Sequence, residues 1–324
     1  MTVQPDTCSR FVISPRFVSE AMHQMRSELV CQAGGWYINF SHAMSKSKQR
    51  GRKDHYVPRG YLRGFIDPAR ESMAKPFWKY DLEIKIWSME SPGSVGWERG
   101  FYDYAEAHPD LVHPDETFDK FEREFSSVRE HMLRRNFKAW VRQDRAFLLG
   151  YIQMMCARSP MFIEHQTEQN RKARGVTVTS VGPGNVIGVD SLELRPPPET
   201  FVRNRTITQM REEVERGTDW LGEFNWCLRY TRSIDDPFVT ADQPVIANGV
   251  EPDRERAFQS RETLIYFPIC WQACLVGSRL RFNEGTDEAT RDFMRHVRGF
   301  YVRSTKGYVI SPRQLADDMF ERSV

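Results

Sequence analysis

The sequence predicts an α+β fold in which central helices pack on a mainly antiparallel sheet. Two observations support this. Apolar residues recur at helical spacing through the middle of the chain, residues 115–218, and with a period of two from residue 220 to residue 305. Because helices and strands are segregated along the chain, alternating βαβ units are not indicated. We expect residues 44–324 to form a single domain.

The first elements after residue 52 are a short helix and a hairpin. Pro58 precedes an apolar run that fits a loop followed by a helix, since proline is tolerated in the first helical turn. Residues 77–82 and 84–87 alternate between apolar and polar side chains, which predicts a β-hairpin with its turn at residues 81–83. Residues 100–104 are expected to form an edge strand or a structured loop.

The middle of the chain is helical. Apolar residues spaced three or four apart predict a helix over residues 117–136. A second helix, residues 143–172, is apolar nearly all round in its first half, and Arg158-Ser159-Pro160 should break or kink it. Glycine and proline mark residues 176–200 as an exposed loop or lid with room for one hairpin, and residues 201–219 suit a charged surface helix.

The last third of the chain is expected to hold most of the sheet. After the strands come a predicted helix at residues 288–297, a last strand at residues 300–303 and a short helical tail. The four predicted strands are residues 226–230, 238–240, 264–267 and 273–277.

The N-terminal segment differs from the rest of the chain. Residues 1–43 lack sustained periodicity, so we interpret them as an appended or mis-assigned leader ahead of Met44, with a genuine N-terminal arm as the alternative. The basic run 46–53 fits a solvated tail, or a weak contact with nucleic acid.

Composition limits the classes of function. The formal net charge of +2 gives no global field to attract nucleic acid or membrane. The six cysteines show no metal-ligand spacing, and no apolar run is long enough for a membrane span. Without a secretory signal, we expect a cytoplasmic protein. Phosphate-binding, dinucleotide-binding and hydrolase motifs are absent, so no cofactor is indicated.

His55 lies in the stretch with the greatest concentration of reactive side chains, residues 53–65. The Asp54-His55 pair invites comparison with an HNH nuclease, but such a site needs an asparagine soon afterwards, and the next one is Asn136. Two interpretations remain for His55: a catalytic or ligand-binding imidazole, or a structural group that caps the following helix.

Asp242 follows a predicted strand and precedes Pro244. Strand ends present polar side chains to ligands, so Thr240, Asp242 and Gln243 are candidates for a site. The alternative is a local turn in which Asp242 accepts hydrogen bonds from its own backbone.

Arg158 and Gln153 are polar groups in the predicted buried helix. A buried arginine requires a partner, for which Asp242 is the candidate. The pair would either shape an anion site or tie the helices to the sheet. Glu122 and Glu124 are both assigned to the helix surface.

Several landmarks together resemble an uncharacterised, mainly bacterial family, domain of unknown function 4238. They are His55-Tyr56-Val57-Pro58-Arg59, Phe101-Tyr102, Gln153, Arg158-Ser159-Pro160 and residues 237–245. The resemblance covers residues 53–305. The family pattern Phe-Ile-Thr-Ser-Asp-Asn-Pro differs here at Ala241 and Gln243, and the resemblance implies no activity.

Two hypotheses follow. The first is a hydrolase acting on a phosphate-containing or nucleic-acid substrate, with His55 as acid/base, Asp242 as its orienting group or a metal ligand, and Arg158 as anion clamp. The other predicted substrate-binding residues are Gln153, Tyr102, Gln243, Thr240 and Arg59. The second is a non-catalytic binding or interaction module, for example in defence or stress, in which His55, Arg158 and Asp242 are structural. Its partner would be a small molecule or nucleic acid, and the oligomeric state is not indicated.

Overall fold

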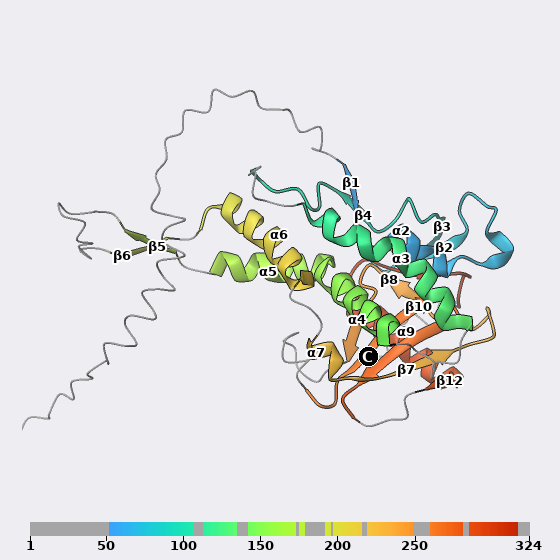
Figure 1. The fold of residues 1–324 in the computed structure, drawn as a ribbon. Coiled ribbons are helices and arrows are strands. Elements are labelled where there is room, and N and C mark those ends of the chain that lie inside the picture. The colour runs from blue at the N-terminus through green and yellow to red at the C-terminus, as the bar shows by residue number, and fades with distance from the viewer. Residues whose placement is uncertain are drawn as a thin grey trace, which may run out of the picture. The chain divides into compact units, whose positions relative to one another are not determined.

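A five-stranded sheet forms the platform of the fold (Figure 1). Its strand order is β12-β7-β11-β10-β9, and all neighbours are antiparallel except β12, which runs parallel to β7. The strands are β7 (Asn225–Tyr230), β9 (Ile246–Asn248), β10 (Leu264–Cys270), β11 (Ala273–Ser278) and β12 (Thr286–Glu288).

The structure is a computed structural model. It describes residues 52–106, 113–134, 142–172, 175–178, 192–195, 197–215, 219–248, 260–280 and 285–316.

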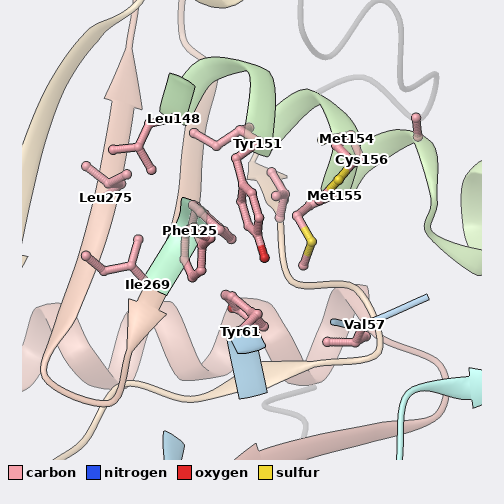
Figure 2. Close-up of a cluster of buried hydrophobic side chains, with 14 of the residues drawn as sticks. Val57, Tyr61, Phe125, Leu148, Tyr151, Met154, Met155, Cys156, Ile269 and Leu275 are labelled. Atoms are coloured by element: carbon pink, nitrogen blue, oxygen red, sulfur yellow. The ribbon is translucent and has the colours of Figure 1, made fainter. Parts of the chain in front are cut away.

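One face of this sheet packs against the central helices. The helices are α2 (Arg59–Leu62), α3 (Pro114–Arg134), α4 (Arg142–Ala157), α5 (Pro160–Lys172), α6 (Glu199–Glu215) and α7 (Asp219–Gly222). Phe125 of α3 and Tyr151 of α4 stack with ring centroids 3.9 Å apart, and Phe267 of β10 lies beside them. Figure 2 shows Phe125, Tyr151 and Tyr61 together with Ile269 and Leu275 of the sheet.

The opposite face of the sheet packs against α9 (Arg291–Ser304). Strand side chains alternate between faces, so Tyr266 and Cys274 belong to this second core while their neighbours belong to the first. From α9 come Met294, Val297, Tyr301 and Val302. Helices therefore cover both faces of an antiparallel sheet, and the predicted α+β class is confirmed.

A four-stranded sheet of order β3-β2-β13-β8 adjoins the second core. It contains β2 (Phe77–Asp81), β3 (Ile86–Glu90), β8 (Thr240–Ala241) and β13 (Tyr308–Ser311). The chain leaves this sheet at Ala241 and enters the five-stranded sheet at Ile246. Residues 242–245 thus form the crossing between the two sheets, which places Asp242 and Gln243 at their junction.

Two small antiparallel pairs complete the described structure. Strand β1 (Lys53–His55) pairs with β4 (Trp97–Arg99), and β5 (Gly175–Val178) pairs with β6 (Leu192–Arg195). Single-turn 3₁₀ helices follow α2 at Arg63–Phe65 and Pro68–Arg70.

Most predicted elements are confirmed. The β2–β3 hairpin is present, although its turn lies at residues 82–85. The predicted break separates α4 from α5 by a bend of 60°. The β5–β6 pair is the hairpin expected within residues 176–200. The predicted leader at residues 1–43 and the end of the chain, residues 317–324, lie outside the described residues.

Helix α6 confirms the helix predicted at residues 201–219, and one side of it is buried at Val202, Thr206, Ile207, Met210 and Val214. Two predictions are wrong. Residues 300–303 are helical, because Val297, Tyr301 and Val302 continue the apolar stripe of α9 at helical spacing. The strand predicted at residues 238–240 is displaced, because Phe238 and Val239 are buried but lie outside any strand. The strand here is β8 at Thr240–Ala241, which pairs with β13 in the four-stranded sheet.

No single helix among the described residues is long and apolar enough to cross a membrane. In the part of the chain that the structure describes, one bent pair, α4 with α5, has the necessary length and composition when the two helices are taken together.

Replacing Phe267 should strongly destabilise the fold. The Phe267→Ala variant leaves a cavity where Tyr61, Phe125 and Tyr151 meet, so we expect a loss of about 3–5 kcal/mol in the free energy of unfolding. Chemical denaturation measures this. Ile84→Ala is the control, because Ile84 is 61% exposed and its truncation should change stability by less than about 0.5 kcal/mol. Similar losses in both variants would contradict this account of the core.

Candidate functional site

The side chain and the backbone of His55 are both engaged by protein groups. The Nε atom of Arg59 donates to the imidazole Nε2 at 3.1 Å. The carbonyl oxygen of His55 accepts from the hydroxyl of Tyr102 at 3.1 Å and from the guanidinium of Arg158. His55 is thereby fixed between the short helix α2 and Arg158, which directly follows α4.

The imidazole of His55 is neutral at neutral pH. Burial, and after it the charges of Arg59, Arg158 and Lys53, together lower its pKa from the usual 6.5 to about 4. Since an arginine always donates, Nε2 must be the unprotonated nitrogen and Nδ1 carries the proton. A group with so low a pKa is a poor general acid or base near pH 7.

Arg158 pairs with Glu122 and not with Asp242, so the predicted pairing is wrong. The Arg158 side chain is 1% exposed and donates to Glu122 Oε1 at 2.6 Å and to the Tyr102 hydroxyl at 2.9 Å. Glu122, assigned from the sequence to the helix surface, is 33% exposed and lies at the border of the core. Glu122 lies on the same stripe of α3 as Phe118 and Phe125, a signal already present in the sequence.

Gln153 connects two helices of the core. Its side-chain amide donates to the Glu213 carboxylate at 2.7 Å and to the Glu213 carbonyl at 3.3 Å. These hydrogen bonds connect α4 to α6, so Gln153 has a structural role between the two helices.

A hydrogen bond of Tyr61 connects the opening stretch, residues 53–65, with the segment 237–245. The Tyr61 hydroxyl donates to the carbonyl of Pro268 at 2.7 Å and lies 2.8 Å from Thr240 Oγ1. Because Tyr61 has one hydroxyl proton, Thr240 is the donor in the second bond. No hydrogen bond within the described residues joins His55 to Asp242, and their convergence stays a prediction.

Tyr56 brings the opening stretch toward Asp242. Burial and the Asp242 carboxylate both raise the pKa of Tyr56, and its hydroxyl interacts with that of Tyr308. Tyr308 is partly buried at the start of β13, and desolvation raises its pKa as well.

Asp242 is held by the backbone of the loop that follows α9. Its Oδ2 atom accepts from the Gly307 amide at 2.9 Å. The approach is so close that a Cβ atom at position 307 would lie 2.6 Å from Oδ2, so only glycine fits without a shift. Burial raises the pKa of Asp242 to about 6, while the Gly307 and Gln243 amides and the Lys306 charge oppose that shift.

A small pocket of about 60 Å³ opens beside Asp242. Its lining comes from the start of α5, the crossing between the sheets and the loop after α9: Pro160, Met161, Glu164, Asp242, Gln243, Ser304 and Lys306. Lys306 and Glu164 form an exposed ion pair of 2.8 Å at its edge. Of the predicted site residues, Asp242 and Gln243 line this pocket.

The sequence did not identify Glu164, Lys306 or Gly307 as site residues. They are ordinary surface residue types on a helix and a loop, and only tertiary packing places them beside Asp242. Within the described part of the chain, no group of three or more metal-ligating side chains occurs.

The sequence matches the family model described as Protein of unknown function (DUF4238) over residues 53–299, more than half of the chain. The chain belongs to this family. No curated protein and no solved structure matches it.

The resemblance seen in the sequence is therefore confirmed at the level of the DUF4238 family. The matched region begins at the first residue of β1 and ends within α9. It includes His55, Arg158 and Asp242, the three residues of the hydrolase hypothesis.

Removing the partner of the buried guanidinium should be costly. The Glu122→Gln variant leaves Arg158 charged in the core, so we expect a loss of up to about 3 kcal/mol in the free energy of unfolding, moderated because Glu122 is 33% exposed. Urea denaturation at neutral pH measures it. Glu124→Gln on the exposed side of α3 is the matched control and should change little. Equal effects would show that the Arg158–Glu122 pair is not important.

The depressed pKa of His55 predicts a pH dependence of stability. Between about pH 4 and pH 6.5, His55 binds a proton in the unfolded chain but not in the folded one. The free energy of unfolding therefore decreases as the pH falls from 6.5 toward 4. The stability of the wild type relative to His55→Gln should fall by about 1–2 kcal/mol over that range, less than the roughly 3 kcal/mol of the full shift, because His55 is only partly buried and solvent screens it. Denaturation curves of both proteins at several pH values measure this difference in the free energy of unfolding. Asp242, whose raised pKa has the opposite effect on stability, is present in both proteins and cancels from the difference. A difference independent of pH would contradict the assigned protonation state.

Proposed function

We propose that this protein is a binding module and that it recognises a small amine-bearing ligand in the pocket beside Asp242. The observation that supports this is which of the predicted site residues line a pocket. All four of His55, Arg158, Asp242 and Gln243 bind other protein groups, but only Asp242 and Gln243 among them also line the described pocket.

The charges at the pocket favour a cation. Glu164 and Lys306 form an ion pair with each other, so Asp242 is the lining carboxylate that remains for a ligand. A carboxylate only accepts hydrogen bonds when ionised, which suits an ammonium or another donor. Pro160 and Met161 offer an apolar wall for a short alkyl chain.

The size of the pocket limits what enters it. One water needs roughly 10–15 Å³ of such volume, so about 60 Å³ admits only a handful of non-hydrogen atoms. Most ligand pockets for larger molecules exceed about 300 Å³. The part of the ligand that is recognised is therefore a small terminal group.

The hydrolase hypothesis is the second candidate, in altered form. A pKa of about 6 suits Asp242 for acid–base work near neutral pH, in contrast to the pKa of about 4 for His55. A phosphate substrate is less well supported, because the expected anion clamp, Arg158, is buried against Glu122.

Thermal unfolding of the full chain with n-butylammonium tests the proposal. We expect this cation to raise Tm by a few degrees at saturating concentration, and butyrate at equal ionic strength to have no effect. The response should be lost in Asp242→Asn and kept in His55→Gln. It should also weaken as the pH falls through 6, because protonated Asp242 no longer attracts a cation.

Two results would overturn this function. One is an equal response to butylammonium and butyrate, and the other is a response unchanged in Asp242→Asn. Hydrolysis of a phosphodiester that is lost in Asp242→Asn but kept in His55→Gln would support the second candidate instead.

A further inference from the structure

The two-stranded ribbon of β1 and β4 separates its bases from its acids. In register, Lys53 pairs with Arg99 and His55 with Trp97, whereas Asp54 pairs with Glu98. Directly paired residues of an antiparallel ribbon project to the same side, and successive residues project to opposite sides. Lys53, His55, Trp97 and Arg99 therefore share one side, which we call the ribbon face, and the two carboxylates lie on the other.

Arg59 adds a third cation to the ribbon face. Its guanidinium donates to His55 Nε2 at 3.1 Å, so it lies next to a residue of that face although it belongs to α2. Lys53, Arg59 and Arg99 are all exposed.

These three cations have no carboxylate partners among the described residues. The neighbouring Arg52 does have them, since it pairs with Asp115 and lies 3.7 Å from Asp54. The neutral imidazole of His55 adds no negative charge and is surrounded by cations. The ribbon face is thus locally positive in a chain whose net charge is only +2.

An aromatic ring lies at the centre of these charges. The indole N–H of Trp97 donates to the carbonyl of Ser94 at 3.1 Å, which fixes the ring, and the ring is only partly buried. The ammonium of Lys53 lies 3.9 Å from the ring centroid, a cation–π contact.

We propose that the ribbon face binds single-stranded nucleic acid. Phosphates would pair with Lys53, Arg59 and Arg99, and a base would stack on the face of Trp97 opposite the Lys53 ammonium. Cations beside an aromatic platform are the combination by which single strands are bound without sequence preference. Arginine suits this role, because its fork binds phosphate oxygens in pairs. This site is separate from the Asp242 pocket and does not depend on the function proposed for it.

Fluorescence anisotropy of a labelled oligothymidine, titrated with the full chain over a salt series, tests this inference. The triple variant Lys53→Gln, Arg59→Gln, Arg99→Gln should bind at least tenfold more weakly. Its slope of log K against log salt should fall by about 2, since each phosphate contact on a single strand contributes roughly 0.7. Trp97→Leu should weaken binding about fivefold or more through lost stacking.

The matched control removes the same charge elsewhere. Lys75→Gln, Lys85→Gln, Lys120→Gln alters three exposed lysines outside the ribbon face and should leave binding within about twofold of wild type. Thermal unfolding of each variant verifies that the fold is retained. If Trp97→Leu lowers Tm, the comparison of the two triple variants alone decides the inference. Failure of the wild type to bind at low salt would overturn the inference, as would equal losses in both triple variants. Heparin binding as tight as that of oligothymidine, with no effect of Trp97→Leu, would overturn the assignment to nucleic acid.

Discussion

The guanidinium of Arg158 is the group on which the arrangement of the helical layer depends. A cation that is 1% exposed is stable in a core only when several groups satisfy its donors. Glu122, the Tyr102 hydroxyl and the carbonyl of His55 do so, and they come from three separate parts of the chain. One buried charge therefore fixes the position of β1 relative to α3 and α4.

A second buried arginine has the same function on the other side of the sheet. Arg298 of α9 donates to Asp236 at 2.5 Å and to the carbonyl of Pro237. Tyr301, one turn later, donates to the carbonyl of Pro244 at 2.5 Å. The segment that carries Thr240 and Asp242 is thus held at both ends by hydrogen bonds from α9.

The two proposed sites have opposite local charge, because different charged groups are left without an opposite charge beside them. At the pocket, Lys306 is neutralised by Glu164, and the Asp242 carboxylate remains. At the ribbon face, strand alternation moves Asp54 and Glu98 to the opposite side, and the cations remain. Neither property depends on net charge, which is nearly zero for the whole chain.

The sequence by itself determined the elements and the family. The stripe of α3, the apolar first half of the α4–α5 region, the break at Pro160 and the short apolar runs of β7, β10 and β11 depend on neighbours within a few residues, so the local pattern reveals them. It also indicated that Arg158 must have a buried partner. The helical end of α9 was missed because Phe300 to Arg303 has strand-like composition, although its spacing is helical.

Only the tertiary structure decided which partners these residues have. Glu122 instead of Asp242 for Arg158, Tyr61 for Thr240, and Gly307 for Asp242 are contacts between segments far apart in the chain. Local spacing does not encode such contacts, because they depend on how the layers pack. For the same reason, the sequence singled out Asp242 as a site residue, but only the fold showed which residues surround it.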